Sequence, residues 1–180
     1  MLWDRINLFA SPVMFTSIDL SKIEIESAPT QKKWFSRTPT THGQNNKLKP
    51  ETEKYLKDNF MLALSPIFGQ PSFSKHTLDI TDVWINDYQV GDYQESHIHA
   101  GVHFSFIIYL NGESQTVFTS PLSNTIQSFY GNLRMFQTNF VTKIEPGGCV
   151  LFPSYLEHFV TAHNKPKKTL SGNIKVVLNR

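Results

Sequence analysis

The chain has 180 residues, of which 39% are hydrophobic and 18% charged, a composition typical of a folded globular protein rather than a disordered one. Its net charge of +2 is too small to indicate a nucleic-acid-binding protein, and no apolar run is long enough to span a membrane. The single cysteine, Cys149, excludes an intramolecular disulfide, and the N-terminus shows no secretory signal pattern. We therefore expect a cytoplasmic protein.

The length predicts one domain, residues 1–180, in two parts. Residues 1–77 would supply N-terminal strands, a loop and a supporting helix, and residues 78–180 would form the β core. Met1–Leu20 mixes apolar residues with a Ser-Pro pair and predicts one or two short entry strands. Glu26–Pro50 is polar, contains three prolines and predicts a long surface loop.

One helix is predicted from Pro50 onward. Proline suits the first helical position, and the glutamates that follow suit the positive end of the helix dipole. Apolar residues then recur at helical spacing, namely Leu56, Phe60, Ala63 and Leu64, and the helix should end between Ser65-Pro66 and Gly69. We expect this helix to pack outside a β core.

From Leu78 onward the sequence changes to short apolar runs separated by Gly, Pro, Asn and Ser, a pattern typical of a sandwich or jelly roll. Asn111-Gly112 predicts a hairpin between two of the strands. Ser120–Asn139 is longer than a tight turn needs and could be a flap over a barrel mouth or a simple surface loop. The predicted strands are Leu78–Tyr88, His103–Leu110, Gln115–Thr119, Phe140–Ile144, Cys149–Phe152, His158–Ala162 and Leu170–Leu178.

The histidines suggest a metal site. His97 and His99 are two residues apart, so on an extended strand both rings would point to the same side. His158 follows the predicted strand Cys149–Phe152 and a Pro153 turn, and is the natural third ligand. Neutral imidazole suits iron, copper, nickel and zinc. The alternative is that His97 and His99 are two half-exposed residues in a turn.

The chain contains a series of short motifs: Trp84-Ile85-Asn86, His97-Ile98-His99, Ser105–Tyr109, Gly148–Pro153, His158, Lys167-Lys168-Thr169 and Asn173. In this order they resemble the motifs of 2-oxoglutarate/iron(II) oxygenases of the prolyl-4-hydroxylase type, and more closely those of a family of such oxygenases found in bacteria and phages. The resemblance covers about Trp84 to Leu178. It implies a mainly β fold, a double-stranded β-helix (jelly roll, cupin-like) with one or two flanking helices, in the host cytoplasm if a phage encodes the chain.

The resemblance also implies the cofactors, Fe(II) and 2-oxoglutarate, and the residues that bind them. His97, His99 and His158 would hold the iron. Lys167 would pair with the far carboxylate of 2-oxoglutarate, and Thr169, Tyr109 and Asn86 would help to bind it. The reaction would consume O2 and oxidise an unidentified substrate, either a protein side chain or a small molecule.

Two positions depart from the pattern of the wider superfamily. His99 occupies the place where most members have a carboxylate ligand, so Glu95 or Asp92 could complete the iron site instead. The basic residue that would bind the far carboxylate of 2-oxoglutarate is a lysine rather than an arginine. Lysine provides a point charge and lacks the bidentate fork of arginine. Lys168 competes with Lys167 for this role and would point to the opposite face if the strand has begun by this point. The alternative is that Lys165–Lys168 is a solvated basic turn.

Other residues are assigned to the core or the surface. Phe104, Phe106 and Phe152 could line the site, although phenylalanine in a strand is usually core. Cys149 should pack inside the barrel. Of the remaining histidines, His103 and His163 should not be ligands, and His42 and His76 should be surface or loop residues.

Two other functions remain open on the sequence. A cupin-type metal enzyme or sensor could use the same three histidines without 2-oxoglutarate, and a non-enzymatic β-barrel could serve as a binding or structural module. Substrate specificity would depend on Glu26–Pro50 and Ser120–Asn139. No pattern in the sequence indicates an oligomeric state.

Overall fold

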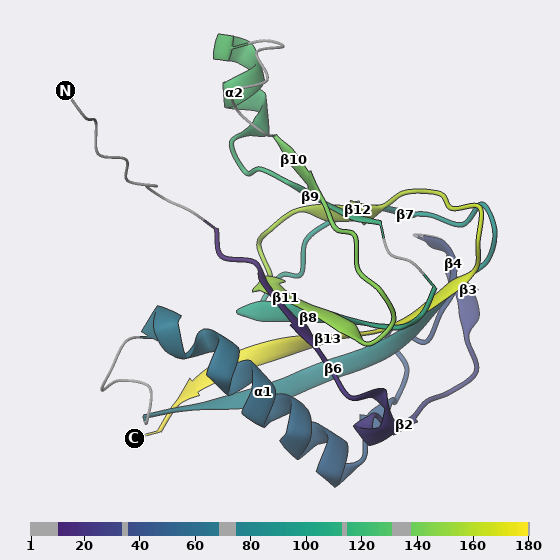
Figure 1. Cartoon of the computed structure of the whole chain (residues 1–180), viewed down its shortest axis with the longest axis vertical. Coiled ribbons are helices and arrows are strands. Elements are labelled where there is room, and N and C mark those ends of the chain that lie inside the picture. The colour runs from purple at the N-terminus through teal and green to yellow at the C-terminus, as the bar shows by residue number, and fades with distance from the viewer. Residues whose placement is uncertain (1–10, 34–35, 69–74, 113–114, 131–137, 180) are drawn as a thin grey trace.

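The computed structural model describes residues 11–33, 36–68, 75–112, 115–130 and 138–179. Its strands form two antiparallel layers that face each other, and strand β4 bridges them (Figure 1). The larger layer contains β1 (Met14–Ser17), β11 (Gly148–Pro153), β8 (Phe104–Asn111), β13 (Lys167–Leu178) and β6 (His76–Tyr88). The smaller layer contains β7 (Gln94–His97), β12 (His158–Val160), β9 (Thr116–Thr119) and β10 (Asn139–Val141).

The remaining elements lie mostly in the N-terminal part of the chain. Strand β4 (Ser36–Thr40) pairs with β6, β7 and β3 (Gln31–Lys33), while β2 (Ile25–Glu26) pairs with β5 (Lys47–Leu48). A short 3-10 helix, η1, spans Leu20–Lys22, and the two α-helices are α1 (Pro50–Phe68) and α2 (Ser123–Tyr130). No helix within the described ranges is long and apolar enough to cross a membrane.

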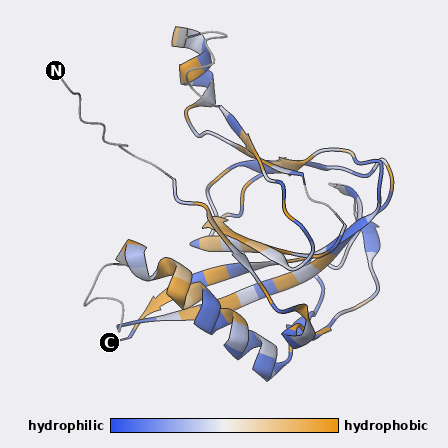
Figure 2. Cartoon of the chain, viewed as in Figure 1, coloured by the Kyte–Doolittle hydropathy of each residue, from blue (hydrophilic) through white to orange (hydrophobic). Residues whose placement is uncertain are grey.

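The larger layer separates two hydrophobic clusters because successive strand residues face opposite sides. On β8, Phe106 and Ile108 face outward and pack against Leu56 and Phe60 of α1. Their neighbours Ile107 and Tyr109 belong to an inner cluster between the two layers. Figure 2 shows both hydrophobic and hydrophilic segments along the two long strands of this layer, β6 and β13.

Strand β13 follows the same alternation and places a polar stripe inside. Leu170 and Ile174 face the outer cluster under α1. Lys167 and Asn173 begin and end a run of alternate residues on the opposite face, all of them buried: Lys167, Thr169, Ser171 and Asn173. The interior of the barrel is therefore polar along β13, which is unusual for a core and indicates a functional site.

Most predicted elements are confirmed. The helix begins at Pro50 as expected, continues through Pro66 and reaches Phe68. Strands are found at all seven predicted places, with one notable shift: β13 begins at Lys167, three residues before the predicted start.

Three sequence predictions are wrong. Glu26–Pro50 is not a surface loop, because it contains β3, β4 and β5 and buries Thr38, Thr40 and Thr41. Asn111-Gly112 does not join a hairpin, since β8 and β9 are not neighbours and belong to different layers. His99 lies beyond the end of β7 rather than on the same strand as His97.

Ser120–Asn139, for which the sequence leaves both a flap and a simple surface loop open, contains α2, and residues 131–137 lie outside the described residues. In Figure 1, α2 stands away from the two layers. Of the entry strands predicted in Met1–Leu20, the structure describes one, β1, and residues 1–10 lie outside the described residues.

Candidate functional site

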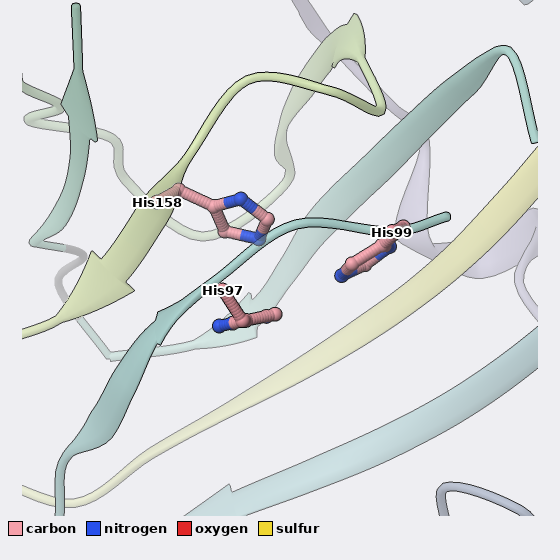
Figure 3. Close-up of side chains that lie close together, drawn as sticks. All are labelled: His97, His99 and His158. Carbon is pink, nitrogen blue, oxygen red and sulfur yellow. The ribbon is translucent and has the colours of Figure 1, made fainter. Parts of the chain in front are cut away.

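Three histidines converge between the two layers (Figure 3). His158 on β12 is the direct cross-strand partner of His97 on β7, so the pairing of these strands brings the two rings to 4.3 Å between centroids. His99 comes two residues after His97, and its ring centroid lies 5.2 Å and 5.1 Å from those of His97 and His158. One ring nitrogen of each lies within 4.8 Å of the others, a spacing that suits a shared metal ion.

Hydrogen bonds at Nδ1 prepare all three rings for a metal. Nδ1 of His97 lies 2.7 Å from the carbonyl of Glu95, and Nδ1 of His158 lies 3.0 Å from the carbonyl of Leu156. Nδ1 of His99 lies 2.7 Å from Oδ1 of the Asn173 side chain. An oxygen acceptor at Nδ1 requires the proton there, which leaves the Nε2 lone pair available to a cation.

Burial keeps these histidines neutral. Desolvation is the main cause that lowers the pKa of His99 to about 4 and that of His158 to about 3. The pKa of His97 is lowered as well, for the same reason. Because metals bind the neutral imidazole, protons do not compete for these rings near neutral pH.

The two carboxylates that could have replaced His99 lie elsewhere. Asp92 is buried and accepts a hydrogen bond from the backbone N–H of Gln89 at 2.9 Å, which caps the turn before β7. Glu95 is exposed, and its backbone carbonyl, not its side chain, contacts His97. Within the described residues, the metal-capable cluster of histidine, cysteine and acidic side chains consists of the three histidines.

Lys167 is the most unusual residue of the site. It is only 2% exposed, and its Nζ has no hydrogen-bond partner. The ammonium lies over the ring of Tyr88 at 4.5 Å, and desolvation lowers its pKa to about 7. A buried cation without an anion is costly, so this arrangement indicates a place for a negatively charged ligand.

Lys168, the competing candidate, points away from the site. Its Nζ pairs with Asp87 at 3.1 Å, with both side chains partly exposed. The alternation of side chains along β13 therefore sends Lys167 inward and Lys168 outward.

Of the other predicted co-substrate residues, Thr169 and Asn86 line the same inner cavity as Lys167. Thr169 and Asn86 face each other across β13 and β6, with the Asn86 amide 3.5 Å from the Thr169 hydroxyl. Tyr109 is fully buried, and its hydroxyl lies 2.9 Å from that of Thr116. Thr116, unlike Tyr109, lines the inner cavity.

Two adjoining cavities meet at the histidines. The inner one has about 20 Å³ of free volume and is lined by all three histidines together with Asn86, Lys167 and Thr169. The outer one has about 590 Å³, a size typical of small-molecule sites. Both share Trp84, Asn86, Gln94, His97 and His99.

The aromatic residues behave mostly as core. Phe106 and Phe104 belong to the outer cluster under α1, and Phe152 packs edge-on against His158 at 4.8 Å without lining either cavity. Cys149 is buried as expected.

The remaining histidines lie outside the metal-capable cluster. His103 accepts a hydrogen bond from the backbone N–H of Val176 at 2.9 Å, and His163 stacks on Tyr88. His76 begins β6.

Sequence reasoning missed two contributors to the outer cavity. His42 is exposed as expected, yet it lines this cavity and contacts the Trp84 ring edge-on at 4.8 Å. Thr40 lines it as well, through the pairing of β4 with β6 at Asn86. Both lie in a segment predicted to be a surface loop, and no local pattern marks them.

Comparisons with known proteins agree with this geometry. A family model described as "Putative 2OG-Fe(II) oxygenase" matches residues 82–173, which include the three histidines, Lys167 and Asn173. The chain belongs to this family. It is therefore an enzyme of the 2-oxoglutarate-dependent oxygenase class, a class that uses Fe(II) and 2-oxoglutarate, and the non-enzymatic alternative is set aside.

Solved structures show the same fold. An oxidoreductase of the 2OG-Fe(II) oxygenase family from Burkholderia pseudomallei is 14% identical, with a TM-score of 0.50 over 86% of this chain and 74% of the other. A Pseudomonas putida prolyl-4-hydroxylase is 17% identical, with a TM-score of 0.50 over 87% of this chain and 78% of the other. The double-stranded β-helix is thus confirmed. No curated protein matches the chain in sequence.

Proposed function

We propose that this oxygenase is a hydroxylase that couples decarboxylation of 2-oxoglutarate to oxidation of a second substrate. The observation that carries the proposal is the buried amine of Lys167, which has no hydrogen-bond partner and lies in the same cavity as three neutral histidines. A cupin enzyme that needs only a metal has no use for such a cation, whereas a dicarboxylate co-substrate requires one.

The donor set fits Fe(II). His97, His99 and His158 would hold the metal through three neutral nitrogens that lie within 4.8 Å of one another, and a site with three protein ligands would leave other positions open. Iron at this place would supply the oxygen chemistry, and the chain's own residues would orient the co-substrate and exclude water.

Lys167 would bind the far carboxylate of 2-oxoglutarate. The charge pair would satisfy the orphaned Nζ, and Thr169 and Asn86 would add hydrogen bonds from the same cavity wall. Tyr109 would act indirectly, by holding the Thr116 hydroxyl. Since the inner cavity has only about 20 Å³ of free volume, its side chains have to turn aside as 2-oxoglutarate enters.

The second substrate would occupy the outer cavity. This cavity reaches His97 and His99 and is also lined by His42, Thr40 and Trp84. Its occupant would be a protein side chain or a small molecule that presents a C–H bond toward the metal position.

The test is a titration of anaerobic, Fe(II)-loaded protein with 2-oxoglutarate, monitored by the visible absorption band that appears when 2-oxoglutarate chelates Fe(II). The band should be absent in His158→Ala and need far more 2-oxoglutarate in Lys167→Ala. Lys168→Ala and His76→Ala are the matched controls and should behave as wild type. Bound iron without a band at any 2-oxoglutarate concentration would contradict the proposal.

A further inference from the structure

His99 is held by a buried network of polar side chains: Ser105 on β8, Asn173 on β13 and Ser154, the residue that follows β11. Its Nδ1 lies 2.7 Å from Oδ1 of Asn173 and 2.9 Å from the Ser105 hydroxyl. Ser105 in turn lies 2.9 Å from Asn173 Oδ1 and 2.9 Å from the hydroxyl of Ser154. Ser105 and Ser154 are 0% and 1% exposed, and Asn173 is 9% exposed.

The backbone fixes the same residues relative to one another. Ser105 on β8 and Asn173 on β13 are direct cross-strand partners. The carbonyl of Ser154, just after β11, accepts the backbone N–H of His99 at 2.9 Å. The ring and the main chain of His99 are therefore both tied to the rigid layer, although His99 lies beyond the end of its own strand.

The protons of the network can be assigned. The Ser105 hydroxyl has one proton, which it donates to Asn173 Oδ1, and it accepts from Ser154. Asn173 Oδ1 and the Ser105 oxygen are then both acceptors toward His99, so the proton between them and the ring belongs to Nδ1. This tautomer leaves Nε2 of His99 as the ligand nitrogen.

We infer that Asn173, supported by Ser105 and Ser154, is the positioning residue that makes His99 a metal ligand. A carboxylate ligand needs no such help, because either oxygen binds a cation whichever way it rotates. An imidazole binds through Nε2 only if its tautomer and ring angle are set, and this chain sets both with neutral partners. The inference rests on the proposed metal site.

Two substitutions of Asn173 that differ in charge distinguish a positioning role from a packing role. Asn173→Leu removes the acceptor while keeping a similar volume, whereas Asn173→Asp keeps an oxygen at the same place and adds negative charge. A role in packing alone predicts that both variants bind metal as wild type does. A positioning role predicts that the leucine variant loses about 10- to 100-fold in metal affinity, the usual effect of removing a ligand's hydrogen-bond partner. It also predicts that the aspartate variant binds at least as tightly as wild type.

The probe is Co(II), with affinity measured by competition with a chelator. Thr52→Val is the matched control: Thr52 is a buried threonine of α1 that donates to the carbonyl of Lys22, remote from the histidines. Its loss should lower stability and leave Co(II) affinity unchanged. Equal Co(II) affinities in wild type and Asn173→Leu overturn the inference.

A second readout needs neither metal nor a change at Asn173. Nitrogen-15 NMR of the metal-free protein reports which ring nitrogen of His99 carries the proton, with its signals assigned by their absence in His99→Phe. The Nδ1–H form supports the inference, and the Nε2–H form overturns it even if Co(II) binds. If wild-type protein shows the Nδ1–H form but binds no Co(II), the proposed function is overturned. The hydrogen bonds around His99 would then have no metal ligand to position.

Discussion

The buried amine of Lys167 predicts a substitution that makes the protein more stable and less active. Lys167→Met keeps the length and apolar stem of the side chain but removes the charge. Most substitutions of buried residues destabilise a protein, so a gain in stability would be diagnostic.

The magnitude follows from the lowered pKa. Burial lowers the pKa of Lys167 from 10.5 to about 7, and 1.36 kcal/mol per unit gives a cost of about 5 kcal/mol for the charged form. At pH 7 the Lys167 amine is about half charged in the folded, ligand-free chain and fully charged in the unfolded chain. The burial of this amine therefore lowers the free energy of unfolding by about 4 kcal/mol at pH 7. Lys167→Met should recover up to this amount.

The dependence on pH has a definite sign. Between pH 7 and 10.5 the unfolded chain binds more protons at this group than the folded chain does, so the wild-type free energy of unfolding rises with pH. The slope due to Lys167 is about 1.4 kcal/mol per pH unit, and the variant lacks it. The advantage of Lys167→Met should therefore be largest near pH 7 and vanish near pH 10.5.

The assay is urea unfolding of metal-free protein at pH 7, 8.5 and 10. Lys168→Met is the control, because its ion pair with Asp87 is partly exposed and should change stability by less than about 1 kcal/mol. The reasoning is refuted if Lys167→Met is no more stable than wild type at pH 7, or if both proteins show the same slope with pH. The same variant should lose 2-oxoglutarate binding.

Three other predictions concern the framework and the metal. Gly172→Ala should lower the free energy of unfolding by about 1–3 kcal/mol, because its Cβ would lie 2.5 Å from the Phe106 ring; urea unfolding measures the loss, and an unchanged midpoint contradicts it. Leu56→Ala, fully buried under the sheet, should lose about 2–5 kcal/mol while folded protein still binds 2-oxoglutarate, and lost binding would refute this separation. Co(II) at a hundred times its dissociation constant should stabilise wild type by about 2.7 kcal/mol but not His158→Ala, as thermal unfolding with and without metal would show.

Local sequence patterns predicted the structure correctly where it depends on the alternation of side chains along a strand. The two-residue period placed Lys167 and Lys168 on opposite faces, and the structure has one inside and the other paired with Asp87. The same alternation suggested that His97 and His99 face one side, and the two rings do lie together, although His99 lies beyond the end of β7. His158 was added from its place after a predicted strand and the Pro153 turn. Helix α1 was recognisable from its first residue and its apolar spacing.

Local patterns failed where a segment is ordered by distant partners. Strand β4 is polar and short, and it forms because Thr40 pairs with Asn86 and Ser36 with Gln94, which lie far along the chain. The hairpin predicted at Asn111-Gly112 is absent for a different reason. Gly112 does adopt a positive φ of 71°, but the strands before and after it, β8 and β9, lie in different layers. Turn chemistry fixes the local bend and leaves the partner of the next strand undetermined.

The same strands carry both the stability and the chemistry of this molecule. Outward residues of β13 such as Leu170 and Ile174 pack under α1, and this apolar layer offsets the cost of the polar face behind it. Lys167 and Asn173 both lie on that inner face, one lacking an anion and the other holding His99. Since a one-residue slip of β13 would exchange the two faces, the hydrophobic packing outside also fixes which side chains reach the metal position.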